Sequence, residues 1–249
     1  GKVEWTYPSP GLPSWQPAGR AIIEFKQPIV ENFEQELGFD WNYLGTPHED
    51  FAKVEDGRLR LKLLKNALVP WEFGNTDGSV FSRIAQIGKT KENVSFVGRR
   101  QQHLDFQATV TVHFSPEENE TAGIIILQND ANQLRLEVTK GQAGKPVVRC
   151  MRVVSHYDQD GIQHFTETQL GEIVADPLQT DFMLQAKGKG SRYSFSAGPT
   201  ANKMQSVADR VDGSFLGSET AGGFVGAYIG LFASGNGQTK EKYAAFETF

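Results

Sequence analysis

The chain has 249 residues and a formal net charge of -5, and 39% of its residues are hydrophobic, including 17 Phe and 4 Trp. This length allows one large β-domain or two small ones, and the apolar residues suffice for a sizeable core. The negative charge argues against a nucleic-acid groove and against an anionic membrane surface as partner. No apolar run approaches the roughly 18 residues needed to cross a membrane. With Cys150 as its single cysteine, the chain forms no intrachain disulfide and no cysteine-rich zinc site, and its compartment stays open.

Residues 1–28 differ from the rest of the chain because they are rich in prolines with aromatic residues between them. The prolines exclude a regular helix or a central strand. We favour an inter-domain linker or an extended strap over an aromatic platform for a ligand. The chain begins at Gly1 without an initiator Met, so we expect a processed product or a segment of a longer protein. The prolines and aromatics concerned are Pro8, Pro10, Pro13, Pro17, Trp5, Tyr7 and Trp15.

Most of the remaining chain alternates between apolar and polar residues. The longest such stretch lies in SFVGRRQQHLDFQATVTVHF (residues 95–114), where every even position from Leu104 to Phe114 is apolar. Side chains of a strand alternate between two faces, so this stretch predicts a long, half-buried β-strand, whereas a helix would scatter the apolar residues around its axis. Similar alternation predicts strands in GRLRLKLLK (57–65), QLRLEVT (133–139), DFMLQAK (181–187) and RYSFSA (192–197).

These short strands are separated by turns rich in Gly, Asn and Pro, without a convincing amphipathic helix. They predict an all-β, antiparallel fold of the sandwich or barrel type. The sequence contains no fixed-period repeat, which argues against a solenoid or propeller within this chain. Residues 66–89 form a long irregular stretch, and long loops on a β-scaffold are where function tends to lie. Cys150 lies in an apolar stretch and is expected to be a small core residue.

Catalytic signatures are missing from the sequence. Glycosidases need two carboxylates at a fixed separation, but the Glu-x-Asp-x-x-Glu pattern of single-sandwich glucanases is absent, so we assign no catalytic residue. Glu117, Glu118 and Glu120 lie in a predicted turn, where we expect them to be solvated. The five histidines do not have the spacing of metal ligands. Nucleophile elbows, phosphate loops and dinucleotide fingerprints are also absent.

A dense polar run precedes the central strand: Arg99, Arg100, Gln101, Gln102 and His103. Planar Arg and Gln groups pair well with hydroxyls and carboxylates, which favours a patch that faces sugar or a neighbouring domain. An equally good interpretation is a cap that satisfies loop carbonyls at the rim of a sandwich.

Three stretches together resemble one known module: SFVGRRQQH, AGIIILQND, and SETAGGFVGAYIGLFASGNG followed by YAAFETF. The module is the C-terminal β-sandwich of glycoside hydrolase family 43 β-xylosidases and arabinofuranosidases. ENFEQELGFDWNYLGTP resembles its start, and WTYPSPGLPSWQP resembles its inter-domain linker. The resemblance covers residues 29–249 and implies a single concanavalin-like jelly roll of two antiparallel sheets. In that family the catalytic carboxylates belong to an upstream five-bladed propeller, in agreement with the lack of a carboxylate pair here.

The resemblance also implies particular site residues. The sandwich packs on the propeller, and a glycine-flanked loop lends an aromatic ring to the rim of the substrate pocket; the matching residue is Phe224, between Gly223 and Gly226. Flanking glycines allow a tight loop that exposes a ring for stacking on a sugar, although Phe224 as a core residue is an equal alternative. No cofactor is implied except a structural calcium ion. Its candidate ligands are Glu31, Glu34 and Glu247, although Asn32 and Ala245 stand where aspartates are expected.

Four hypotheses follow. The leading one is a non-catalytic accessory module of a xylan- or arabinan-degrading glycosidase, with the upstream propeller and plant-polysaccharide oligosaccharides as partners. The second is a self-standing carbohydrate-binding module that uses exposed aromatics such as Trp71, Tyr157 or Trp41. The third is a complete small hydrolase or lyase, supported only by the polar run with Arg100 and His103. The fourth is an interaction domain that forms homo-oligomers, which is compatible with the first.

Overall fold

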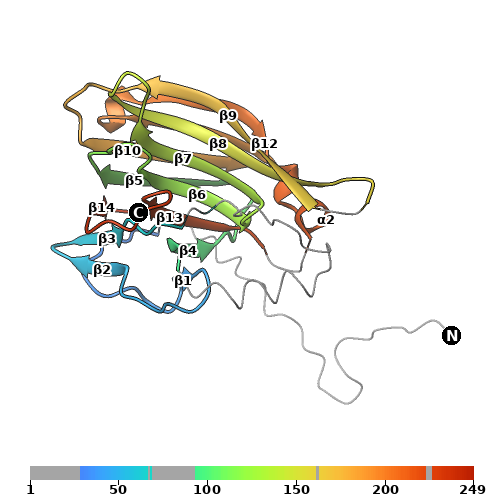
Figure 1. Ribbon diagram of the computed structural model, residues 1–249, viewed down its shortest axis with the longest axis horizontal. Coiled ribbons are helices and arrows are strands. Elements are labelled where there is room, and N and C mark those ends of the chain that lie inside the picture. Colours follow the sequence, from blue (N-terminus) through green and yellow to red (C-terminus); the bar gives the residue numbers. More distant parts are fainter. Residues whose placement is uncertain (1–28, 67, 69–92, 161–162, 223–225) are drawn as a thin grey trace, which may run out of the picture. The chain divides into compact units, whose positions relative to one another are not determined.

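The computed structural model describes residues 29–66, 68, 93–160, 163–222 and 226–249. The chain divides into two compact units, residues 1–30 and 31–249. The second unit is a β-sandwich of two sheets with seven strands each, and every strand pairing within the sheets is antiparallel. The two sheets lie face to face in Figure 1, with β6, β7 and β8 over β5 and β10. The predicted all-β, two-sheet class is therefore confirmed.

The first sheet contains a four-stranded meander and three strands from distant parts of the chain. In spatial order its strands are β1 (Asn42–Tyr43), β4 (Ser95–Arg100), β13 (Tyr228–Ser234), β6 (Thr121–Asn129), β7 (Asn132–Lys140), β8 (Pro146–Tyr157) and β9 (Gln163–Val174).

The second sheet has the order β12 (Gln205–Asp212), β11 (Arg192–Gly198), β10 (Asp181–Lys189), β5 (Phe106–His113), β14 (Tyr243–Glu247), β3 (Arg58–Lys62) and β2 (Ala52–Glu55). Helical structure in the described residues is limited to three short elements: η1 (Ala201–Lys203), η2 (Ser214–Leu216) and α2 (Ser218–Ala221). None of the described helices has the length and apolarity that crossing a bilayer requires.

The alternation around residues 104–114 is realised in β5. Val110, Val112 and Phe114 are buried in the core, while Thr111 and His113 lie on the opposite face. The prediction is wrong at Leu104, which is 68% exposed. The reason is that the chain passes from the first sheet to the second after β4, so Leu104 lies in the connection and not on the inner face of a strand.

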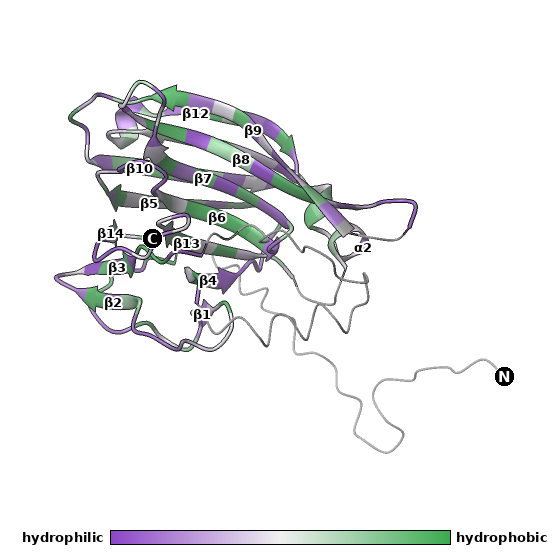
Figure 2. Ribbon diagram, in the orientation of Figure 1, coloured by the Kyte–Doolittle hydropathy of each residue, from purple (hydrophilic) through white to green (hydrophobic). Residues whose placement is uncertain are grey.

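One hydrophobic core fills the space between the two sheets. Large side chains such as Phe182, Phe195 and Phe246 come from the second sheet and pack against Ile124 and Leu231 of the first. Green segments alternate with purple ones along most strands in Figure 2, as expected where one face of a strand is buried. Cys150 is fully buried in this core, and its burial raises the pKa of the thiol to about 12.

The edge strands β9 and β12 lie against each other and close one side of the sandwich, as Figure 1 shows. A Cβ atom at Gly171 of β9 would lie 1.9 Å from the carbonyl oxygen of Val207 in β12. Gly171 follows a shift of register between Cys150 and Met151, where Leu170 is the extra residue of a β-bulge. Bulges bend a strand and increase its twist, so this one directs β9 toward the other sheet.

Candidate functional site

The outer face of the first sheet, which points away from the second sheet, is buried and polar along β7. Leu134, Leu136 and Val138 of this strand belong to the core, so the residues between them point to the outer face. An antiparallel sheet with one face on the core commonly leaves its other face in water. Here, however, the four outer-face residues are at most 5% exposed: Gln133, Arg135, Glu137 and Thr139.

A cavity of about 260 Å³ lies on this outer face. The pairing of β13, β6, β7 and β8 brings its residues side by side, because Ser234 is opposite Thr121 and Glu137 is opposite Arg149. Described residues from five strands and two connecting segments line the cavity: Phe232 and Ser234 (β13), Thr121 (β6), Arg135 and Glu137 (β7), Arg149 (β8), Glu167 (β9), Leu68 and Asn236.

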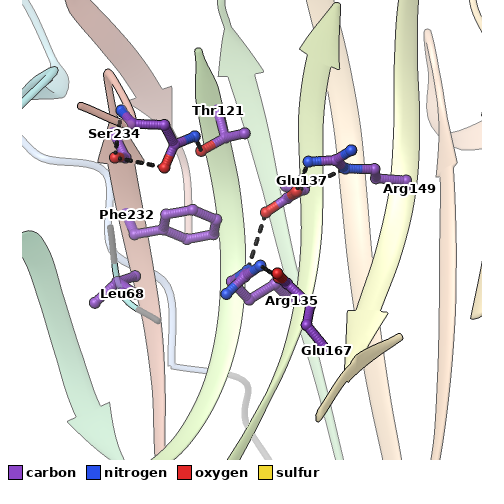
Figure 3. A pocket seen from close by; sticks show the side chains of 9 residues that line it. Leu68, Thr121, Arg135, Glu137, Arg149, Glu167, Phe232 and Ser234 are labelled. Carbon is purple, nitrogen blue, oxygen red and sulfur yellow. Dashed lines mark hydrogen bonds and ion pairs between the residues drawn. The ribbon is translucent and has the colours of Figure 1, made fainter. Parts of the chain in front are cut away.

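A network of four charged side chains forms one wall of the cavity. Glu137 is its centre: Arg149 donates to Glu137 Oε1 from Nε (2.8 Å) and lies 2.7 Å from it through Nη2, and Arg135 Nε donates to Glu137 Oε2 (3.0 Å). Arg135 also pairs with Glu167 and donates to Gln133 Oε1 at 3.2 Å. Figure 3 shows the chain of contacts from Arg149 through Glu137 and Arg135 to Glu167.

The burial of this network gives it an electrostatic cost. The side chains of Arg135 and Glu137 are only 6% and 2% exposed. Burial by itself lowers the pKa of the Arg135 guanidinium, but the adjacent carboxylates of Glu137 and Glu167 outweigh it, and the pKa lies above its usual value. The cost of desolvating two charges can exceed their attraction within a buried ion pair, so a contribution to the stability of the fold does not by itself explain such a network. Charged groups held in a cavity are therefore candidates for a functional site.

The opposite wall of the cavity is neutral and polar. Asn236 donates from its side-chain amide to Thr121 Oγ1 (3.2 Å), and Ser234 Oγ donates to the side-chain oxygen of Asn236 (3.0 Å). Between the two walls lies the ring of Phe232, with Leu68 beside it, as seen in Figure 3. Leu68 and Phe232 belong to a small second hydrophobic cluster with Phe96, Ile125 and Leu127. The cavity thus offers hydrogen-bonding groups on two sides of an apolar floor.

Arg99 and Arg100 of the predicted polar run point to different surroundings. Arg99 is held by carboxylates at 2.9 Å (Glu31) and 2.7 Å (Asp40), and its guanidinium lies 4.6 Å from the ring centre of Trp41. Arg100 is exposed and lies over the ring of Tyr228, to whose hydroxyl it donates at 3.1 Å.

Gln101 and His103 lie in the connection after β4. Gln101 donates from its backbone to the carbonyl of Ala227 and from its side chain to the carbonyl of His103, and it accepts from Tyr193. These contacts to loop carbonyls are of the kind that the capping interpretation predicts. His103 is exposed. A sugar- or domain-facing role for Arg99, Arg100, Gln101 and His103 stays a prediction.

The three residues predicted as calcium ligands, Glu31, Glu34 and Glu247, do not form a common ligand cluster. Glu31 is bound by Arg99 and by Trp41 Nε1 (3.4 Å), Glu34 is exposed, and Glu247 is bound by His113 (2.7 Å) and Arg58 (3.4 Å). Across the described residues, no group of three His, Cys, Asp or Glu side chains is arranged to hold a metal ion. Calcium binding stays an untested expectation.

Two expectations about burial are wrong. Glu120 was expected to be solvated with its neighbours, but it is completely buried, with Lys242 at 2.7 Å and Lys240 at 2.9 Å. Trp41 was named among exposed aromatics, but it is 5% exposed and packs against Phe33. Residues distant in the sequence contribute to both environments: Lys240 and Lys242 contact Glu120, and Arg99 and Phe249 contact Trp41. Phe224 and Trp71 lie outside the described residues, while Tyr157 is 58% exposed.

Sequence reasoning missed the cavity and its charged wall. The alternation in QLRLEVT predicts a strand, but it assigns no role to Arg135 and Glu137, which lie between the apolar positions. One signal was available: the outer face of one strand carries both charge signs, and Arg149 and Glu167 follow in the next two strands. Only the register of β7, β8 and β9 brings them into contact.

Comparisons with known proteins identify the family. The family model described as "Beta xylosidase C-terminal Concanavalin A-like domain" matches residues 30–249. The chain is 28% identical over its whole length to the non-reducing end alpha-L-arabinofuranosidase BoGH43B of Bacteroides ovatus, of which it covers 40%. It is also 28% identical over 81% of its length to a xylosidase/arabinosidase of Butyrivibrio fibrisolvens, of which it covers 33%.

A solved structure, Bacteroides ovatus Xyloglucan PUL GH43B, superposes on 90% of this chain with a TM-score of 0.67 and 27% identity. The match covers 38% of that structure's chain, so the present chain spans less than half the length of the relatives it matches. The match of residues 30–249 and the two-sheet fold lead to one conclusion. The chain belongs to the family of β-xylosidase C-terminal concanavalin A-like domains of glycoside hydrolase family 43.

Proposed function

We propose that this chain is the non-catalytic accessory β-sandwich of a xylan- or arabinan-degrading glycoside hydrolase of family 43. In this role it packs on an upstream catalytic propeller and helps to shape the substrate pocket. The observation that carries the proposal is the family match over residues 30–249. The relatives are named as arabinofuranosidase and xylosidase/arabinosidase, and the chain corresponds to 40% and 33% of their length. The remainder of such an enzyme has room for a catalytic domain.

The electrostatics of the described residues support a non-catalytic role. A glycosidase needs one carboxyl group with a raised pKa as general acid, beside a second carboxylate. Three described carboxyl groups have a pKa that is shifted downward instead: Glu120, Asp212 and Glu247. Glu137 and Glu167, the carboxylates of the cavity, are both engaged by arginines.

The glycine-flanked loop around residue 224 is the part proposed to reach the pocket rim. Of the residues next to it, Gly222 has φ +72°, which favours glycine, and a Cβ at Gly226 would lie 3.2 Å from Arg100 Nη1. Arg100 and Tyr228 are in contact with each other where the chain enters β13. We propose that Phe224 stacks on substrate there and that Arg100 supports the loop.

The first test is turnover by this chain alone. On aryl β-xylosides and aryl α-arabinofuranosides we expect no hydrolysis above the buffer rate, because neither the sequence motifs nor the described residues provide an acid–base pair. The same chain joined to its propeller is expected to be active. Turnover by the isolated chain, abolished by one of its own carboxylate substitutions, would contradict the proposal.

The second test concerns the rim in the joined protein. Phe224→Ala is expected to raise KM by roughly threefold, since loss of one aromatic contact has about that effect. Tyr157→Ala is the matched control, because Tyr157 is an exposed aromatic at the end of β8; its KM should not change. Equal KM values for both variants and the parent would remove Phe224 from the proposal.

A further inference from the structure

We propose that the cavity on the outer face of the first sheet is a binding site for one neutral sugar unit, of pentose size. The site is formed by the sandwich itself, and it is separate from the glycine-flanked loop of the proposed function. From the proposed function this inference takes only the class of sugar, a pentose of a plant polysaccharide.

The first argument is size. The cavity measures about 260 Å³, just below the range of about 300–1,000 Å³ that is typical for drug-sized ligands. A single monosaccharide fits such a volume, whereas an oligosaccharide chain needs an open groove. The proposal is therefore restricted to a single sugar, free or at the end of a chain.

The second argument is charge. The charged residues of the described lining are two arginines and two glutamates, so the formal charge of the wall is balanced. A charged ligand would disturb ion pairs whose centre, Glu137, has a side chain only 2% exposed. A neutral ligand with many hydroxyls can donate to carboxylates and accept from guanidinium groups without changing that balance.

The third argument is the distribution of polar and apolar groups. A sugar ring has hydroxyls at its rim and C–H groups on its faces. The cavity has Arg149 and Glu167 on one side, Thr121 on the other, and the ring of Phe232 between them, as Figure 3 shows. This is the arrangement that a monosaccharide requires for hydrogen bonds at its rim and an apolar contact at its face.

The fourth argument is that polar atoms remain available at the mouth. Arg149 uses Nε and Nη2 to bind Glu137, and Glu167 uses Oε1 to bind Arg135. Within the described part of the chain, Arg149 Nη1 and Glu167 Oε2 have no hydrogen-bond partner. Their side chains are 31% and 36% exposed, in contrast to the buried pair behind them. Arg135 and Glu137 thus position Arg149 and Glu167, which face the ligand.

Nuclear magnetic resonance titration of the isotope-labelled full chain tests the site. D-Xylose and L-arabinose are the probes, and glucuronate is the charged comparison because it is xylose with a carboxylate added at C5. We expect a Kd on the order of 1 mM for one of the two pentoses, as suits a ligand of this size. The amide shifts should lie in β6, β7, β8 and β13, and glucuronate should bind at least fivefold more weakly.

Two substitutions at the cavity are expected to weaken pentose binding. Arg149→Gln removes a charged donor and should raise Kd about tenfold, while Thr121→Val removes one hydroxyl and should raise Kd about threefold. Thr111→Val and Arg192→Gln change the same residue types on the second sheet and should leave Kd unchanged. Thermal unfolding of each variant confirms that it is folded, and Thr121→Val keeps the test valid where Arg149→Gln fails to fold.

Shifts confined to the second sheet, or no saturable shifts up to 50 mM pentose (about fifty times the expected Kd), would overturn the proposal. Preferential binding of glucuronate would also overturn it, because the balanced wall would then not select a neutral ligand. These outcomes are independent of the proposed function, which fails on turnover by the isolated chain. A cavity that binds no sugar in an otherwise active joined enzyme would refute only the present inference.

Discussion

Among the described residues, the two buried acidic side chains, Glu120 and Glu137, are each paired with cationic side chains. Glu120 is completely buried but lies between Lys240 and Lys242, and it accepts from the backbone N–H of Glu117 at 2.7 Å. Burial, the largest single influence, would raise the pKa of Glu120. The hydrogen bonds from Lys242, the Glu117 N–H and Lys240 together outweigh it, and the pKa lies below its usual value of 4.5. The folded state therefore favours the ionised form.

This shift predicts how Glu120→Gln changes the pH dependence of stability. A carboxyl group whose pKa is lower in the folded state than in the unfolded state adds to the free energy of unfolding. This contribution is complete above the unfolded pKa near 4.5, and it is lost as the pH falls through the folded pKa. At pH 7 the variant should lose roughly 2 kcal/mol of unfolding free energy, because two lysines lose their buried partner. Below about pH 4.5 the difference from the parent should shrink.

Urea unfolding between pH 7 and pH 3 measures this effect. Glu118→Gln is the matched control, since Glu118 lies in the same turn and is exposed; its unfolding free energy should change by less than about 0.5 kcal/mol. A constant difference between Glu120→Gln and the parent across the whole pH range would show that the carboxylate is not the titrating partner.

At the scale of the elements, β7 and β9 decide what the first sheet can do. Strand β7 is buried on both faces, with leucines toward the core and the Arg135–Glu137 pair toward the cavity. Strand β9 supplies Glu167 to the same cavity and then, past the bulge at Leu170, approaches β12. The close contact at Gly171 therefore anchors the strand that also positions part of the candidate site.

Gly171→Ala is expected to destabilise the sandwich by about 2 kcal/mol, as overpacking of a tight contact does. The added Cβ would lie 1.9 Å from the Val207 carbonyl oxygen, so the backbone of β9 or β12 must move. Gln169→Ala in the same strand is the control, because Gln169 is exposed, and its change should stay within about 0.5 kcal/mol. Thermal or urea unfolding measures both variants; equal stability for the two would mean that the edges do not meet as described.

At the scale of the whole molecule, one core joins the two sheets. The described members of this core come from both sheets and from the segment after Glu31, such as Phe33 and Trp41. The first and last residues of the second unit, Glu31 and Phe249, are joined by two backbone hydrogen bonds of 2.7 and 2.9 Å. Residues 31–249 thus contain a complete core, which leaves the outer faces of both sheets for recognition.

This organisation predicts that residues 29–249 fold without the preceding Pro-rich segment. Deletion of residues 1–28 should leave one cooperative unfolding transition and change Tm by less than about 3 °C, because a loss of 1 kcal/mol shifts the Tm of a domain this large by about 2–4 °C. Calorimetry of the full chain and of the shortened chain checks this. A second transition, or a large fall in Tm after the deletion, would show that residues 1–28 belong to the folded domain.

The sequence by itself determined the all-β class, because alternation with a period of two records which face of each strand is buried. The alternation in GRLRLKLLK and QLRLEVT predicts strands whose apolar residues share one face, and these residues are buried in the core: Leu59, Leu61, Leu63, Leu134, Leu136 and Val138. Motif resemblance also identified the family over nearly the same residues as the family model.

The tertiary structure alone decided which polar residues are buried and with which partners. Period-two alternation says nothing about what covers the second face of a sheet, so the burial of Arg135 and Glu137 was invisible in the sequence. The burial of Glu120 and Trp41 depends in part on segments distant in the chain, whereas Leu104 is exposed because it lies in the connection between the two sheets. Contacts such as Arg135–Glu167 join residues more than thirty positions apart, and only strand order and register bring such residues together.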